Sequence, residues 1–194
     1  WKAVMDTEPW KGKQYVKEGP NYAATYVSWD DAVAYCKKLS AKEGKTHRLP
    51  TEAEWEAAAR CGADTLYAGS TVIDDVAWHG GNAGAVTHTV AAKAPNTCGL
   101  YDMSGNAPEW CVDQYINGFY ATPTAALPNP TAGDSFAWLI QNMDVAARTN
   151  RVIRSGGWGN NEGGPLRCAA RTAAGGDFVS APHLFPAFRC VLPG

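Results

Sequence analysis

The chain has 194 residues, of which 45% are hydrophobic, and a net charge of -2. This length is sufficient for one domain with a full core, and the slightly acidic balance argues against nucleic acid as a partner. The sequence contains no run of about 18 apolar residues, so we expect no direct membrane span. Its abrupt start at Trp1 suggests that an export signal has been trimmed from the N-terminus.

Two helices are predicted early in the chain. Residues 1–27 are polar and aromatic, and they read as loop. Ser28, with an acidic residue three positions on, forms a variant capping box, and the helical apolar period that follows ends at Gly44. Thr51, with a glutamate three positions on, begins a second capped helix that ends near Cys61.

The remainder of the chain, from residue 63, is rich in Gly, Asn, Pro and Thr and shows no long helical period. Residues 87–90 are predicted to form a short strand, and residues 136–147 a short helix. Residues 152–154 form a further strand candidate before a Gly-Gly-Trp turn. Long ordered loops need internal contacts, which Trp side chains, disulfides and bound cations usually supply.

The six cysteines occupy positions 36, 61, 98, 111, 168 and 190, and no Cys-x-x-Cys spacing occurs among them. This spacing argues against a structural zinc site and is compatible with disulfides in an exported protein. Buried free thiols in a cytosolic protein are the alternative. Cys98 and Cys111 bracket a Gly-Leu-Tyr-Asp block, and they either form a bridge or stay reduced.

Six sequence blocks occur in a defined order, at residues 27–32, 48–56, 99–106, 109–110, 166–171 and 188–190. In order and spacing they resemble the formylglycine-generating enzyme (sulfatase-modifying factor) family, over about residues 26–191. The resemblance implies an α+β fold, a C-type lectin-like fold in its formylglycine-generating-enzyme variant. Such a domain has two helices, short strands and much irregular structure, and we expect one such domain over residues 1–194.

The family's oxidase uses two cysteines in the loop that precedes its Arg-Cys-Ala-Ala-Arg block, because thiolates bind copper(I), a soft cation. In this chain the corresponding loop, residues 159–166, contains no cysteine. By position, Asn160 and Gly163 stand where the two cysteines would be, and neither can do thiol chemistry. We therefore expect no copper, no catalytic residue and no oxidase activity. The four histidines are scattered, which argues against the metal chemistry of the related sulfoxide-synthase branch.

Family members that contain disulfides join the first helix to the terminal Phe-Arg-Cys, and the end of the second helix to the Arg-Cys-Ala-Ala-Arg block. All four positions are cysteines here. The resemblance therefore implies the pairs Cys36–Cys190 and Cys61–Cys168. Each bridge would close a long loop, which is worth about 4–5 kcal/mol in the chain-entropy account of disulfide stabilisation.

The family also binds calcium at the block that begins with Gly-Leu-Tyr-Asp. Mapped by motif, two carboxylates and two backbone carbonyls would hold the ion, at Asp102, Gly105, Ala107 and Glu109. Hard oxygen donors suit calcium, so the resemblance implies a structural calcium ion. The alternative is that the two carboxylates cap turns or pair with an arginine.

Residues 172–187 are nearly uncharged and contain several large apolar side chains, which either form an interaction surface or fill the core. Some members of the family are targets of diversity-generating retroelements, which rewrite adenines in Asn codons of the C-terminal region. Positions rewritten in this way do not become Lys, Glu, Gln, Met or Trp, and none of these five occurs in residues 172–187. This resemblance implies a variable region at about residues 151–190.

We therefore expect a non-catalytic ligand- or protein-binding module rather than an enzyme. It would be exported to the cell surface or periplasm, lipid-anchored through a trimmed N-terminus, and would bind an unidentified protein or small molecule at its C-terminal loops. The alternative is an enzyme or maturation factor of the family that uses chemistry without the two cysteines. The expected contact residues are Asn160, Asn161, Thr172, Phe178, Ser180, His183, Leu184 and Phe185.

Overall fold

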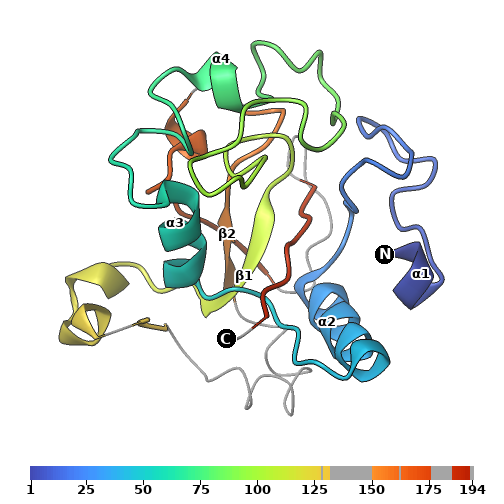
Figure 1. Ribbon diagram of the computed structural model, residues 1–194, viewed down its shortest axis with the longest axis horizontal. Coiled ribbons are helices and arrows are strands. Elements are labelled where there is room, and N and C mark those ends of the chain that lie inside the picture. The colour runs from blue at the N-terminus through green and yellow to red at the C-terminus, as the bar shows by residue number, and fades with distance from the viewer. Residues whose placement is uncertain (128, 132–149, 162, 176–184, 193–194) are drawn as a thin grey trace.

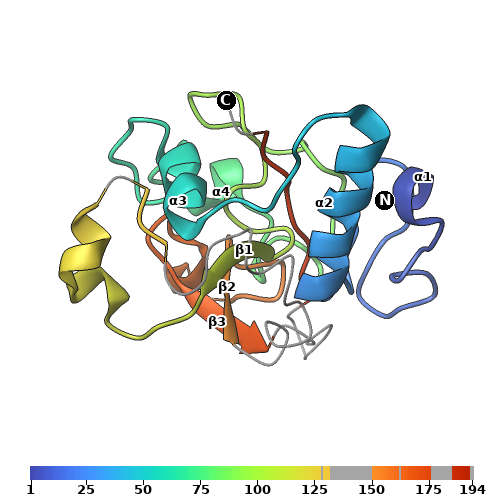
Figure 2. The same cartoon turned by 90° about the horizontal axis from the view of Figure 1, so that it is seen from below.

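The computed structural model describes the chain except for residues 128, 132–149, 162, 176–184 and 193–194. A small antiparallel sheet lies between two helices, and long loops cover the rest of the domain (Figures 1 and 2). The described elements, in chain order, are α1 Lys2–Met5, α2 Trp29–Glu43, α3 Glu52–Arg60, α4 Ile73–Val76, β1 Glu109–Gln114, η1 Phe119–Ala121, η2 Pro123–Ala126, β2 Asn150–Arg154, η3 Gly164–Leu166 and β3 Thr172–Gly175. None of the described helices is long and apolar enough to cross a membrane.

Both predicted helices are confirmed, with the caps that the sequence indicated. The Ser28 hydroxyl accepts a hydrogen bond from the Asp31 backbone N–H at the start of α2, and the Asp31 carboxylate accepts one from the Ser28 N–H in return. Gly44 ends this helix in the left-handed conformation, with φ of 66°. Thr51 and Glu54 form the same reciprocal pair at the start of α3. These contacts satisfy N–H groups that a helix end leaves without partners.

The sheet has the order β1-β2-β3, and both of its pairings are antiparallel. Its side chains alternate between the two faces, as a strand requires. Trp110 and Ile153 pack on the α2 side, in a cluster with Trp29. Cys111 and Val152 pack on the α3 side, in a second cluster. The sheet is therefore buried on both faces, with α2 on one side and α3 on the other.

A buried cluster of charges joins α3 to β2 and to the Arg-Cys-Ala-Ala-Arg block. Glu52 and Arg154 are 0% and 1% exposed, and Arg154 Nη1 donates to Glu52 Oε1 at 2.6 Å. Arg171 donates to both oxygens of the same carboxylate, at 2.6 and 2.7 Å. Glu56, one turn further along α3, accepts from Arg154 Nη2 at 2.7 Å. We call these four residues the ionic cluster.

Two predicted elements differ in the structure. The strand expected at residues 87–90 is reduced to one isolated bridge, between Tyr22 and Thr89. It does not form because its backbone N–H groups bond to three separate acceptors instead of one neighbouring strand: Tyr15 O, Asn106 Oδ1 and Asn21 O. The helix expected at residues 136–147 lies outside the described residues.

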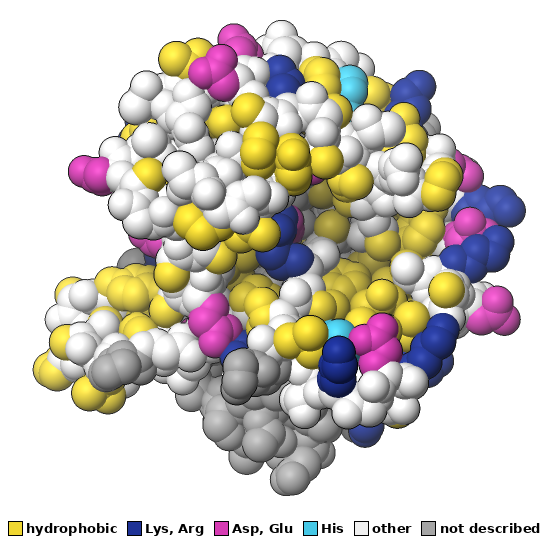
Figure 3. All heavy atoms as spheres, viewed as in Figure 1, with side chains coloured by type: hydrophobic (Ala, Val, Ile, Leu, Met, Phe, Trp, Pro, Cys, Tyr) yellow, Lys and Arg dark blue, Asp and Glu magenta, His cyan; other side chains and the backbone are white. Residues whose placement is uncertain are grey.

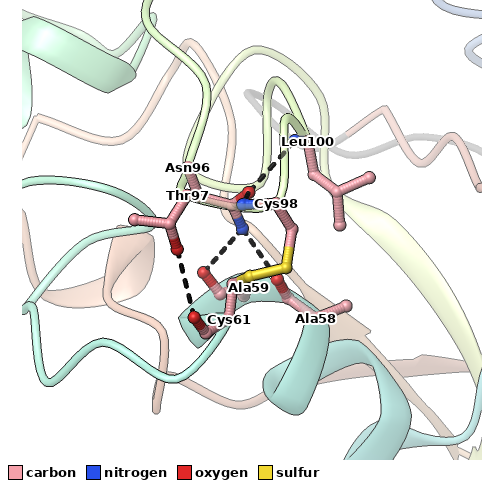
Figure 4. Close-up of a disulfide and its surroundings, with 7 residues drawn as sticks. All are labelled: Ala58, Ala59, Cys61, Asn96, Thr97, Cys98 and Leu100. Atoms are coloured by element: carbon pink, nitrogen blue, oxygen red, sulfur yellow. Dashed lines mark hydrogen bonds between the residues drawn. A yellow bond between two sulfur atoms is a disulfide. The ribbon is translucent and has the colours of Figure 1, made fainter.

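The disulfide pairing differs from the prediction. Cys61 is bonded to Cys98, so the predicted Cys61–Cys168 bridge is wrong, and so is a bridge between Cys98 and Cys111 (Figure 4). Cys111 and Cys168 are free thiols, buried together in the cluster on the α3 side. The predicted Cys36–Cys190 bridge is not formed either. Its two sulfur atoms lie 3.4 Å apart as free thiols.

A capping turn explains why Cys61 meets Cys98. Asn96 donates from its side-chain amide to the carbonyls of Ala58 and Ala59, at 2.7 and 3.0 Å, and so caps the C-terminal end of α3 (Figure 4). The Thr97 hydroxyl donates to the Cys61 carbonyl at 3.1 Å. These contacts hold the turn against the helix end, where Cys61 is the C-cap residue.

Removal of this bridge tests the corrected pairing. We expect the Cys98→Ser variant to lose about 2–4 kcal/mol of unfolding free energy, because the bridge joins residues separated by 37 positions. The Cys61→Ser variant should lose a similar amount, and the double variant no more than either single one, since all three lack the same bond. Urea unfolding measures these losses. Additive losses, or a mapped peptide that joins Cys61 to Cys168, would contradict the pairing.

Candidate functional site

The loop that follows β2, residues 155–166, corresponds to the one in which the family's two cysteines were expected. It begins with a sharp turn, in which Ser155 has φ of 77° and Gly156 has φ of 63°. The Ser155 hydroxyl lies within hydrogen-bond distance of the Asp102 and Gly105 carbonyl oxygens, at 3.2 and 3.1 Å. The turn is therefore fixed to the block that the sequence marked as a calcium site.

The two positions that replace the cysteines have structural roles in this loop. Asn160 Oδ1 accepts the Gly157 N–H at 2.7 Å, and the Asn160 carbonyl accepts the Gly80 N–H at 2.9 Å. Gly163 packs against Tyr67 so closely that a Cβ at this position would collide with the Tyr67 hydroxyl. Asn160 and Gly163 therefore shape the loop, and thiols at these positions would disturb contacts that the structure uses.

Four aromatic rings, which we call the aromatic cluster, support the same region: Tyr15, Tyr26, Trp158 and Phe185. The Phe185 ring lies 4.6 Å from Tyr26 and 5.9 Å from Trp158, measured between ring centroids. Tyr15 stacks on Trp158 at 5.6 Å and is 47% exposed. Offset aromatic pairs of this kind stabilise beyond their buried area. The cluster forms a rigid base beneath the Gly-Gly-Trp loop, with Tyr15 at the surface.

The predicted contact residues differ in how exposed they are. Asn161 is exposed, whereas Asn160 is half-buried and engaged within the loop. Thr172 is exposed but lies at the start of β3, where it pairs with Ile153. Phe185 is only 5% exposed, so its assignment as a contact residue is corrected to a core residue of the aromatic cluster. Four of the predicted contacts lie outside the described residues: Phe178, Ser180, His183 and Leu184.

Sequence reasoning missed Tyr15 and Tyr26, which belong to the loop before α2. Their ring partners, Trp158 and Phe185, are more than 130 positions away in the chain. No local period can indicate a contact over such a separation. The only sequence signal was the density of aromatic residues in residues 1–27.

The two carboxylates predicted to bind calcium have other partners, and the predicted carbonyl of Gly105 accepts the Ser155 hydroxyl at 3.1 Å. Asp102, Ala107 and Glu109 line one cavity of about 420 Å³, together with Arg189. The Asp102 carboxylate accepts the Ala91 N–H at 2.8 Å, and burial raises the pKa of Asp102. Both Glu109 oxygens accept hydrogen bonds from Arg189, at 2.5 Å each. In this arrangement a calcium ion would have to displace the Arg189 guanidinium from Glu109.

Among the residues that the structure describes, no group of three His, Cys, Asp or Glu side chains gathers so that it could hold an ion. The Glu109 carboxylate also accepts from the Trp55 indole N–H at 2.8 Å. The pair of Glu109 and Arg189 therefore ties the C-terminal segment to β1 and α3. Calcium binding at this block stays a prediction.

The fold and its loop geometry define a small α+β domain of the C-type lectin-like class, with structural neighbours among variable proteins and formylglycine-generating-enzyme-like proteins. The chain belongs to the sulfatase-modifying factor family. The sequence profile described as "Sulfatase-modifying factor enzyme 1-like domain" matches residues 1–192. The resemblance inferred from six sequence blocks is thereby confirmed.

Relatives in the family include both active and inactive proteins. The chain is 32% identical over 214 residues to the formylglycine-generating enzyme of Thermomonospora curvata, an alignment that covers 98% of this chain and 63% of that enzyme. It is 36% identical over 115 residues to the inactive C-alpha-formylglycine-generating enzyme 2 of Bos taurus, covering 52% of this chain and 36% of that protein. The chain thus spans less than two thirds of the length of these relatives.

Two solved structures show the fold clearly. Treponema denticola variable protein 1 superposes with a TM-score of 0.76 and 26% identity, over 98% of this chain and 79% of that one. PvdO from Pseudomonas aeruginosa superposes with a TM-score of 0.66 and 27% identity, over 90% of this chain and 63% of that one. The predicted C-type lectin-like class is confirmed by these neighbours.

Proposed function

We propose that this chain is a non-catalytic binding module of the sulfatase-modifying factor family, which recognises a protein or small-molecule ligand at its C-terminal loops. The observation that carries the proposal is the loop that follows β2. The two positions expected to hold the oxidase cysteines are Asn160 and Gly163, and both take part in folding the loop. A loop built in this way offers no thiolate for copper(I).

Similarity to Treponema denticola variable protein 1 supports a surface that varies on a constant framework. The sequence is consistent with this, because residues 172–187 contain none of the five residue types that adenine rewriting of Asn codons cannot produce. We propose that a diversity-generating retroelement rewrites this segment. Exposed residues on a rigid scaffold are where sequence variation is tolerated and binding is usually located.

The exposed members of the predicted site are the residues that would contact the ligand. Asn161 projects from the Gly-Gly-Trp loop, and Thr172 is exposed on β3. Tyr15 adds a half-exposed aromatic ring next to the same loop. Aromatic side chains supply much of the binding energy at protein interfaces. Phe185 and Trp158 support this surface from below without reaching it.

We also propose that the protein is exported to the cell surface or periplasm. The disulfide between Cys61 and Cys98 supports this location, because disulfides persist in oxidising compartments. Fractionation of the native host tests it. Recovery of the protein in the cytosolic fraction would contradict an exported protein, and recovery in the periplasmic or surface fraction is the expected result.

An oxidase assay separates the binding module from an enzyme of the family. We expect no formylglycine formation on a cysteine-containing sulfatase peptide in the presence of copper, with the Thermomonospora curvata enzyme as the positive control. The Asn160→Cys/Gly163→Cys double variant should stay inactive, because a side chain at position 163 collides with Tyr67. Turnover by the wild-type chain would overturn the proposal. Activity only in the double variant would show that two thiols are all that this loop lacks for oxidase activity.

We propose that calcium binds at the Asp102 block, as family resemblance implies. Because Arg189 already pairs with Glu109, we expect weak binding, in the range of about 0.1–1 mM. Thermal unfolding in calcium and in chelator measures the effect, since a ligand of the folded state raises the unfolding temperature. The increase should disappear in the Asp102→Asn variant. An unchanged unfolding temperature of the wild type at saturating calcium would contradict the proposal.

A further inference from the structure

A cavity of about 620 Å³ is lined entirely by residues from the first 24 positions of the chain. Three of these residues are aromatic, Trp1, Trp10 and Tyr22, and two are acidic, Glu8 and Glu18. In the view of Figure 3 the face of the molecule is hollowed, and hydrophobic side chains lie among acidic and basic ones on the side where Figure 1 shows α1. The cavity volume is typical of small-molecule sites.

Two of the three aromatic rings are fixed by contacts outside the cavity. The Trp1 ring stacks on Tyr35 of α2 at 5.4 Å between ring centroids, and its indole N–H donates to the Thr7 hydroxyl at 2.8 Å. Tyr22 is held by its isolated bridge to Thr89. Both rings are half-buried, so part of each remains open to the cavity.

The third ring, that of Trp10, is carried by two successive turns. The Lys11 N–H donates to the Glu8 carbonyl, and the Lys13 N–H donates to the Trp10 carbonyl, at 3.0 Å each. Trp10 is also half-buried. The three rings are therefore held in place before any ligand arrives, which lowers the entropy that binding costs.

The charges that line the cavity do not balance. The Glu8 carboxylate accepts from the Lys2 ammonium at 2.9 Å, and this hydrogen bond lowers the pKa of Glu8. Glu18 accepts the Gly12 N–H at 2.8 Å, but no Lys or Arg among the described residues forms an ion pair with it. Two carboxylates and one ammonium group line the cavity, so one negative charge has no counter-charge there.

We propose that this cavity binds a small quaternary ammonium ion of the choline class, with its methylated nitrogen against the rings of Trp1, Trp10 and Tyr22 and with Glu18 as its counter-charge. Aromatic faces attract cations, and quaternary ammonium ions are typical ligands of aromatic sites. Such an ion has no N–H group to donate, so rings and carboxylates can hold it without directed hydrogen bonds.

The inference does not depend on the binding function proposed for the C-terminal loops. None of the residues proposed as contacts there lines this cavity. A result that excludes one site therefore leaves the other unaffected.

The test titrates the whole chain with choline chloride, against sodium chloride at the same ionic strength, and follows the indole N–H signals by proton NMR. We expect saturable shifts of the Trp1 and Trp10 signals. The neutral carbon analogue of choline, in which a tert-butyl group replaces the trimethylammonium group, has the same shape without the charge. It should bind at least about tenfold more weakly.

Variants of the lining residues separate ring contacts from charge. Trp10→Ala should weaken choline binding about tenfold, and Trp10→Phe should weaken it less, because a ring remains. Glu18→Gln should weaken binding about threefold, since the amide oxygen can still accept from Gly12 but carries no charge. Lys2→Ala should tighten binding about threefold, because it leaves the Glu8 carboxylate without a cation.

Tyr120→Ala is the matched control, because Tyr120 is an aromatic residue of η1 that is 45% exposed and does not line the cavity. Its affinity for choline should equal that of the wild type. Equal weakening in Tyr120→Ala and Trp10→Ala would overturn the proposal, since the loss would then not come from the cavity.

Four further results would overturn the proposal. The first is the absence of any saturable shift with choline. The second is equal binding of the neutral analogue, which would show that the cavity recognises apolar volume and not charge. The third is unchanged affinity in Trp10→Ala or in Glu18→Gln while circular dichroism remains native. The fourth is binding to phosphatidylcholine vesicles without binding of free choline, which would assign the rings to a lipid surface.

Discussion

The Glu52→Gln substitution is expected to lower the free energy of unfolding by about 3–5 kcal/mol, the usual loss when one partner of a buried ion pair is removed. Glu52 is fully buried, and its carboxylate is the common acceptor for Arg154 and Arg171. A glutamine has the same shape but no charge, so Arg171 would lose its paired carboxylate and the buried Arg154 would keep only that of Glu56. Urea unfolding of the variant measures the loss.

Glu56→Gln is the matched control, because Glu56 lies one turn along α3 and pairs with the same Arg154. Its side chain is 28% exposed, so solvent can replace part of what is lost, and we expect a decrease of about 1 kcal/mol. Equal losses of unfolding free energy in the two variants would show that the greater burial of Glu52 does not make its ion pairs more important than those of Glu56. A loss below about 1 kcal/mol for Glu52→Gln would contradict the role given to the ionic cluster.

The second large effect is expected for Phe185→Ala, with a loss of about 3–5 kcal/mol, because truncation of a buried Phe removes apolar contacts and leaves a cavity. Phe185 packs against Tyr26 and Trp158, and Trp158 belongs to the loop after β2. We therefore expect the variant to loosen that loop as well. Urea unfolding gives the loss, and near-ultraviolet circular dichroism reports the packing of the aromatic cluster.

Asn161→Ala is the control for this prediction, because Asn161 belongs to the same loop as Trp158, a ring partner of Phe185, but is exposed. Its unfolding free energy should stay within about 0.5 kcal/mol of the wild type. If Phe185→Ala were equally neutral, Phe185 would be a surface residue, as the sequence first suggested. If the near-ultraviolet signal were unchanged, the aromatic cluster would not depend on it.

The helices could be predicted because their signals are local. The caps at Ser28 and Thr51 are made by side chains three positions apart, and Gly44 ends its helix through its own backbone. The family could likewise be recognised from short blocks, whose residues include Glu52 and Arg171 of the ionic cluster and the pair of Glu109 and Arg189. Such blocks carry the fold because they place charged partners on separate elements.

The features that could not be predicted depend on contacts between distant segments. The partner of Cys61 is decided by the turn that Asn96 fixes on the end of α3, and no cysteine spacing reveals that turn. Phe185 lies in an apolar run that reads equally well as surface or core, and rings from the first 27 residues decide between the two. Contacts between residues so far apart in the sequence form only when the whole chain folds, so a local sequence pattern does not show them.

The most direct test of the binding-module account is a comparison of sister copies of this gene from related strains. The account predicts that substitutions gather at the exposed Asn161 and Thr172 and within residues 176–184 of the sequence, and that they avoid Lys, Glu, Gln, Met and Trp. It also predicts that Glu52, Arg154, Arg171 and Phe185 are unchanged, because they hold the framework. Sister copies with a constant polar set at the exposed positions would contradict the account, and would favour an enzyme of the family with chemistry of its own.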